Sequence, residues 1–103
     1  MPEKLTEEAF AQHLNTKFRA RVEAPRPLEL LLTQVRRYDT GSGERNDMER
    51  FSLYFQGPPD MMLPQGTYTF DHEGMGELAL FIVPIGRDED GFRYEVVFNY
   101  FRK

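Results

Sequence analysis

Two histidines are the first candidates for chemistry in this chain, because imidazole can act as an acid, a base or a metal ligand near neutral pH. His13 lies in a segment with helical periodicity, and we expect it on the solvent side. His72 lies between the carboxylates of Asp71 and Glu73 at the end of an alternating segment. Adjacent strand residues point to opposite faces, so these three side chains are poorly placed to chelate one ion. We predict a structural role for His72, with a hydrogen bond across the following turn.

The other residues that could support catalysis form no convincing pattern. The chain has no Cys, which excludes thiol nucleophiles, thiolate metal sites and disulfides. Its glycines never form a phosphate-binding loop that leads into a helix. The acidic run from Asp88 to Gly91 is followed directly by a strand pattern, which indicates a plain turn rather than a calcium loop. We therefore expect no enzymatic activity, no metal and no cofactor.

A basic stripe raises the question of nucleic-acid binding. Lys17, Arg19 and Arg21 alternate along one predicted strand and share a face. Further arginines follow in the sequence, at Arg36, Arg37, Arg45 and Arg50. The whole chain, however, has 13 Lys and Arg against 17 Asp and Glu, and its net charge of -4 disfavours binding to phosphates.

The alternative for this stripe is a solvated face that keeps an edge strand from aggregating. In that case the cations pair with nearby glutamates, which are Glu23, Glu29 and Glu95. We favour this alternative and expect no nucleic-acid partner.

The elements that position these residues are one helix and six strands. Thr6 fits an N-cap before Glu7 and Glu8, and Phe10 and Leu14 form a narrow apolar stripe, which predicts a helix over about 6–14. Alternation with a period of two then predicts strands at about 17–23, 28–35, 51–56, 67–72, 77–85 and 92–101.

We therefore predict one mainly β domain over residues 1–103. It is a six-stranded antiparallel meander that forms a small barrel or rolled sheet over about 16–101, with one short N-terminal helix. The apolar positions change parity near Thr33 and Gln34, which indicates a β-bulge.

Two features predict a surface for a partner. The fifth strand is apolar on both faces, and its second face needs a cover, either the N-terminal helix or a partner subunit. The loop from Pro58 to Pro64 contains flexible apolar side chains that either plug one end of the barrel or contact another protein. The candidate partner-binding residues are Pro59, Met61, Met62, Leu63, Phe81 and Val83.

Several segments carry a resemblance to a known family. They are Phe51–Pro58, Leu63–Tyr68, His72, Gly76–Gly86 and Tyr94–Asn99, with Lys4–Thr6 and Phe10 at the start. Over about residues 1–99 the chain resembles a family of small uncharacterised bacterial proteins, one of the domains of unknown function. The resemblance implies no particular activity or ligand. It associates such proteins with tail-collar proteins of phage-like particles, which implies an accessory or assembly role.

We expect a non-enzymatic small β-barrel that binds an unidentified protein partner or self-associates. The alternative is a small-molecule-binding or catalytic barrel, with a pocket near His72 lined by Tyr54, Tyr68 and Tyr94. The acidic N-terminus has no signal-peptide pattern, and the longest apolar run, Leu78–Ile85, is too short to span a bilayer. We expect a cytoplasmic protein with no membrane partner.

Overall fold

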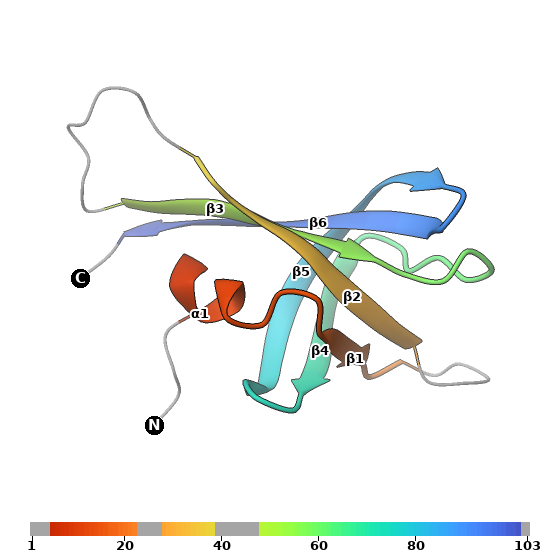
Figure 1. Cartoon of the computed structure of the whole chain (residues 1–103), viewed down its shortest axis with the longest axis horizontal. Coiled ribbons are helices and arrows are strands. Elements are labelled where there is room, and N and C mark those ends of the chain that lie inside the picture. Colours follow the sequence, from red (N-terminus) through yellow and green to blue (C-terminus); the bar gives the residue numbers. More distant parts are fainter. Residues whose placement is uncertain (1–4, 23–27, 39–47, 102–103) are drawn as a thin grey trace.

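A short helix and six antiparallel strands make up the fold (Figure 1). The computed structural model describes residues 5–22, 28–38 and 48–101. Its elements are α1 (Glu7–Ala11), β1 (Lys17–Ala20), β2 (Leu28–Arg37), β3 (Met48–Gln56), β4 (Gly66–His72), β5 (Gly76–Asp88) and β6 (Gly91–Phe101). The predicted turn at 24–27 and most of the predicted loop at 38–48, with Glu23 and Arg45, lie outside the described residues.

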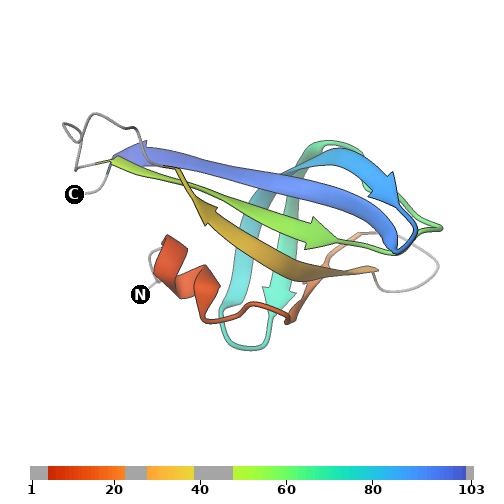
Figure 2. The same ribbon diagram turned by 45° about the horizontal axis from the view of Figure 1, so that its top comes forward.

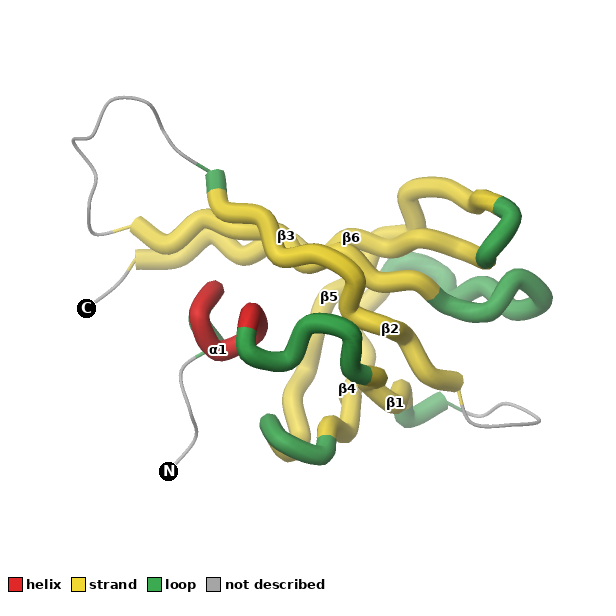
Figure 3. Tube along the Cα trace, viewed as in Figure 1, coloured by secondary structure: helices red, strands yellow, loops and turns green. Residues whose placement is uncertain are grey.

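The six strands form one closed, ring-like sheet in the order β1-β2-β3-β6-β5-β4. Short β1 closes the ring, because it pairs with β2 on one side and with Asp71 and Phe70 of β4 on the other. The predicted fold class, a mainly antiparallel β domain with one short helix, is confirmed. The strand order differs from that of a simple meander, because the segment 57–65 carries the chain away from β3 before β4 begins (Figure 3).

Two β-bulges bend the sheet. The register of β2 against β3 shifts between Leu32 and Gln34, which confirms the predicted bulge. A second shift in β5 lies between Pro84 and Gly86. Pro84 lacks an amide hydrogen, so it fits a place where the ladder is already irregular.

The core lies inside the ring, where alternate residues of each strand meet. Its largest fully buried side chains are Phe10, Phe18, Leu28, Leu30, Leu32, Phe51, Leu53, Phe55, Phe70, Leu80, Ile82 and Tyr94. Each such side chain contributes about 2 kcal/mol on burial. The alternation in the sequence therefore specifies which face of each strand points inward.

Helix α1 packs on β2 and β3 and sends Phe10 into the core. The ring of Phe10 lies 6.2 Å from that of Phe51 and 5.6 Å from that of Phe98. Thr6 accepts a hydrogen bond from the amide of Ala9, as expected for the N-cap, but the helix is shorter than predicted. Our expectation that α1 covers the second face of β5 is wrong, because β2 and β3 provide its docking site.

Candidate functional site

His72 is held by hydrogen bonds on both ring nitrogens. Its Nδ1 accepts the backbone amides of Gly74 at 2.9 Å and Met75 at 3.0 Å. Its Nε2 lies 2.8 Å from the hydroxyl of Thr16, and that hydroxyl donates its only proton to the carbonyl of His13. The Nε2 atom of His72 must therefore carry the ring proton. This arrangement confirms the predicted structural role.

The same hydrogen bonds limit the chemistry of His72. Burial, followed by the neighbouring His13, lowers the pKa of His72 below its ordinary value, and Glu73 opposes that shift. Protonation would turn Nδ1 from an acceptor into a donor that faces two other donors. A general base or metal ligand needs a free ring nitrogen, and His72 has none.

His13 packs against His72, contrary to the prediction that it points to solvent. The two ring centroids are 4.6 Å apart in an edge-to-face arrangement. His13 also lies over the turn after β4, because a Cβ added to Gly74 would be 2.6 Å from its Cε1 atom. The segment after α1 and the β4–β5 turn are thus joined by side chains as well as by hydrogen bonds.

A pocket of about 1010 Å³ opens beside these histidines. It is lined by His13, Asn15, Thr16, Lys17, Arg19, Glu29, Asp71, His72, Glu73, Gly74, Gly76 and Glu77. A pocket near His72 is therefore present, but the prediction that Tyr54, Tyr68 and Tyr94 line it is wrong.

All three cations of the basic stripe form ion pairs within the chain. Arg21 forms a bidentate contact with Asp71, at 2.8 and 2.7 Å, which holds the pKa of that carboxyl below its usual range. Arg19 and Lys17 both reach Glu29, at 3.5 and 3.9 Å. The predicted pairing with Glu29 is confirmed, and the predicted pairing with Glu95 is wrong.

Glu95 is instead the centre of a hydroxyl cluster that the sequence analysis missed. Its Oε2 atom accepts from Ser52 at 2.8 Å, from Tyr38 at 3.2 Å and from Tyr54 at 3.3 Å. The hydrogen bond with Tyr38, burial and the charge of Glu95 raise the pKa of Tyr54 to about 12, so its hydroxyl stays protonated. A signal was available, since Ser52 and Tyr54 are the outward residues of a strand that pairs with β6.

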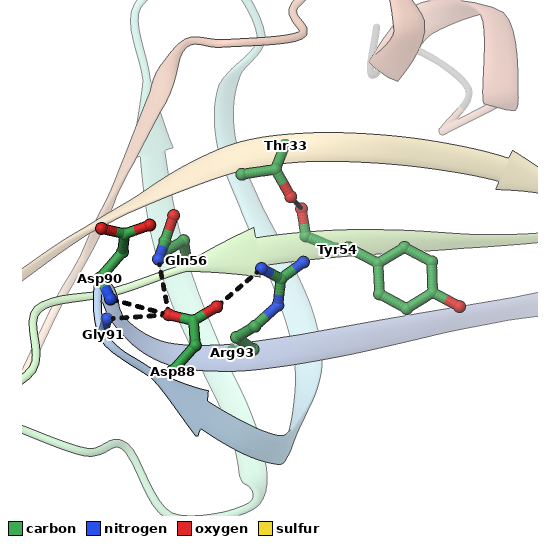
Figure 4. Close-up of polar contacts among 7 residues, drawn as sticks. All are labelled: Thr33, Tyr54, Gln56, Asp88, Asp90, Gly91 and Arg93. Carbon is green, nitrogen blue, oxygen red and sulfur yellow. Dashed lines mark hydrogen bonds and ion pairs between the residues drawn. The ribbon is translucent and has the colours of Figure 1, made fainter.

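The acidic turn between β5 and β6 is confirmed as a structural turn (Figure 4). Asp88 Oδ1 accepts the amides of Asp90 and Gly91 and the side-chain amide of Gln56, while Oδ2 accepts from Arg93. Gly91 has a φ of 142°, which favours glycine. Both carboxylate oxygens are therefore already bonded within the chain.

Part of the proline-methionine loop packs into the core, in keeping with the first of its two predicted roles, a plug. Leu63 is only 5% exposed, and its amide donates to the hydroxyl of Tyr94 at 2.9 Å. The hydroxyl of Tyr68 donates to the carbonyl of Pro64 at 2.8 Å. Met61 is half-buried against the core. Leu63 is therefore wrong as a partner-binding residue, because it belongs to the folded interior, whereas the partly exposed Met61 stays a prediction.

Pro59 and Met62 are exposed members of the same loop, as a contact surface would require. They lie on either side of Asp60 and Met61 and are not adjacent in the chain. Among the residues predicted for partner binding, Phe81 and Val83 are the ones that share a strand.

The outer side of β5 carries a row of apolar residues that we call the β5 apolar row. Its members are Ala79, Phe81 and Val83, and the exposed Ile85 follows them in the β-bulge. Phe81 is 49% exposed and Ile85 47% exposed, whereas Val83 is half-buried. The alternate residues Leu78, Leu80 and Ile82 are buried in the core. The prediction that this strand is apolar on both faces is confirmed.

Residues 5–22, 28–38 and 48–101 contain no group of three or more His, Asp or Glu side chains placed to hold a metal ion. No helix within these residues is long and apolar enough to cross a membrane.

Comparison with known proteins places the chain in a family. A family model described as a domain of unknown function, DUF6916, matches residues 5–98. No curated protein and no solved structure matches the chain. The match covers α1, the first five strands and most of β6. The expected resemblance to a domain of unknown function is thereby confirmed, and the chain belongs to the DUF6916 family.

Proposed function

We propose that this domain is a non-catalytic binding module that contacts another protein through the β5 apolar row. The observation that carries the proposal is the half exposure of Phe81 in the row and of Ile85 after it, in a strand whose other face already fills the core. Exposed apolar side chains in one continuous row are typical of protein interaction surfaces.

The neighbours of the row fit the same interpretation. Thr69 and Thr67 of β4 pair with Ala79 and Phe81, and Glu95 of β6 pairs with Val83. The residues that pair directly with the row are therefore polar. Protein interfaces commonly have such an apolar centre with a polar rim.

The polar groups support a non-catalytic role. Both nitrogens of His72, both oxygens of Asp88 and the hydroxyl of Tyr54 are bonded within the chain. No buried side-chain nitrogen or oxygen among the described residues lacks a hydrogen-bond partner. An acid, base or nucleophile needs a group that is free to exchange a proton or attack a substrate.

Site-specific photo-crosslinking tests the proposal. A photoreactive amino acid at position 81 is expected to capture a protein, whereas the same group at Glu8, an exposed residue of α1, is not. The captured protein is then purified, and its affinity is measured by calorimetry. Phe81→Ser should raise Kd by about tenfold or more, because buried aromatic residues dominate interface energy.

The matched control is Thr67→Ala, which changes a polar neighbour that pairs directly with Phe81. It should change Kd by less than about threefold, as expected for the rim of an interface. The proposal fails if Phe81→Ser leaves the affinity unchanged, or if position 81 captures nothing beyond the products from position 8.

The second candidate function is binding of a small polar ligand beside His72. The observation that favours it is the pocket of about 1010 Å³, lined by two cations and four carboxylates. An NMR titration with a library of small polar fragments tests it. Saturable shifts confined to the amides of 13–19 and 71–77 would support it, and their absence would exclude it for the classes represented.

A further inference from the structure

Strand β6 loses one of its two neighbours halfway along its length. It pairs with β5 only from Gly91 to Glu95, whereas its pairing with β3 continues to Phe101. The first half of β5, as far as Ile82, pairs with β4 instead. In Figure 2 the half of β6 toward the C-terminus has β3 along one side and no strand drawn along the other. Beyond Glu95, β6 is thus an edge strand within the described part of the chain.

This edge lacks the usual protection against pairing. Alternate residues of an antiparallel strand direct their amide and carbonyl groups away from a given neighbour, so part of the backbone after Glu95 points away from β3. The segment 96–101 has the sequence Val-Val-Phe-Asn-Tyr-Phe, with no charge and no proline. Exposed edges normally carry a charge, a proline or a bulge.

Two other strands with a partly unpaired side carry charges along it. The first half of β5 contains Glu77, and the second half of β2 contains Arg36 and Arg37. The edge of β6 over residues 96–101 contains no charged residue. Val97 belongs to this segment, and its side chain is 58% exposed.

We propose that the free edge of β6 pairs with the same edge of a second copy of this chain. The two strands run antiparallel about a two-fold axis near Asn99, so that the two sheets join into one. An antiparallel edge is self-complementary under such an axis, because each copy offers the same donors and acceptors. Two chains of net charge -4 repel each other overall, but residues 97–101, which face their own copies about Asn99, contain no charged side chain.

A second copy fits this edge better than a foreign peptide. Domains that bind a peptide by strand addition use pockets beside the edge to select its side chains. The described pocket lies beside His72 and contains no residue of β6. This assembly uses β6 and leaves the β5 apolar row available, so it does not depend on the function proposed above.

Light scattering and sedimentation of the full chain over a hundredfold range of concentration test the proposal. We expect a dimer of twice the 12.1 kDa chain mass. Val97→Lys gives each edge the charge that normally protects an exposed strand from pairing, and it should weaken the dimer by about tenfold or more. Thr67→Lys is the matched control, because it adds the same charge at an exposed position of β4 that is paired within the ring. It should leave the dimer intact.

A second variant protects the test against a folding defect. Asn99→Asp changes the side chain very little in volume but sets two carboxylates against each other at the axis, so the dimer should weaken at low salt and recover at high salt. Circular dichroism verifies that each variant is folded. A monomeric wild type, or a dimer that neither Val97→Lys nor Asn99→Asp weakens, would overturn the proposal. Either result would leave the crosslinking test at Phe81 unaffected.

Discussion

The His72 end of the ring and the outer side of β5 and β6 differ in how their groups are satisfied. Around His72, both ring nitrogens and the Thr16 hydroxyl are bonded to other parts of the chain. On the outer side, Phe81 and Val97 are about half exposed, at 49% and 58%. A titratable side chain that lines a pocket can therefore act in stability alone. Apolar side chains on a regular strand, in contrast, can stay exposed and available for contact with other molecules.

The largest loss in the free energy of unfolding is expected from a substitution of His72. His72→Phe keeps an aromatic ring beside Phe18 but leaves two backbone amides and the Thr16 hydroxyl without their partner. We expect a loss of about 3 kcal/mol in the free energy of unfolding, because three hydrogen bonds are lost and each contributes about 1 kcal/mol. Urea denaturation measures it. His13→Phe is the control and should cost under about 1 kcal/mol; equal losses would mean that ring packing matters more than the hydrogen bonds.

A smaller loss in the free energy of unfolding is expected where the loop 57–65 packs against Tyr94. Tyr94→Phe removes the acceptor of the buried Leu63 amide and should cost about 1–2 kcal/mol. Tyr68→Phe removes a hydrogen bond to the exposed carbonyl of Pro64 and should cost under about 0.5 kcal/mol. Hydrogen exchange at the Leu63 amide should accelerate only in Tyr94→Phe. Equal acceleration in both variants would contradict the assignment of Tyr94 as the main anchor.

The pH dependence of stability tests the structural role of His72 separately from packing. The pKa of His72 is lowered in the folded state, so the unfolded chain binds more protons just below the ordinary histidine value of about 6.5. Stability should therefore be complete above about pH 6.5 and fall as the pH drops toward the folded-state pKa. Thermal melts between about pH 5 and pH 8 measure it. The fall should be reduced in His72→Gln, and a fall of unchanged size in that variant would assign it to other groups.

The local features of the fold could be predicted because they depend on neighbours in the sequence. Alternation identified the inward side chains of the strands, Thr6 identified the start of α1, and Asp88 to Gly91 identified a turn. The role of His72 followed from the same logic, since its Nδ1 partners lie two and three residues away.

The features that could not be predicted depend on residues far apart in the chain. Thr16 and His72 are separated by 56 positions, and Ser52 and Glu95 by 43. Such contacts follow from the strand order, which alternation does not specify. The docking of α1 was mistaken for the same reason, because an apolar stripe indicates that a helix packs but does not indicate which sheet face it meets.

The smallest effect on stability is expected at Phe81, and it gives the most direct test of the account. Phe81 and Leu80 are adjacent in β5, but Leu80 is 1% exposed and Phe81 is 49% exposed. Urea denaturation of the two variants at low protein concentration compares the two faces of one strand. Leu80→Ala should lose about 2–5 kcal/mol, and Phe81→Ser should stay within about 0.5 kcal/mol of the wild type. A loss in Phe81→Ser as large as that in Leu80→Ala would show that the outer face of β5 belongs to the folding core, and would contradict its assignment as a surface for a partner.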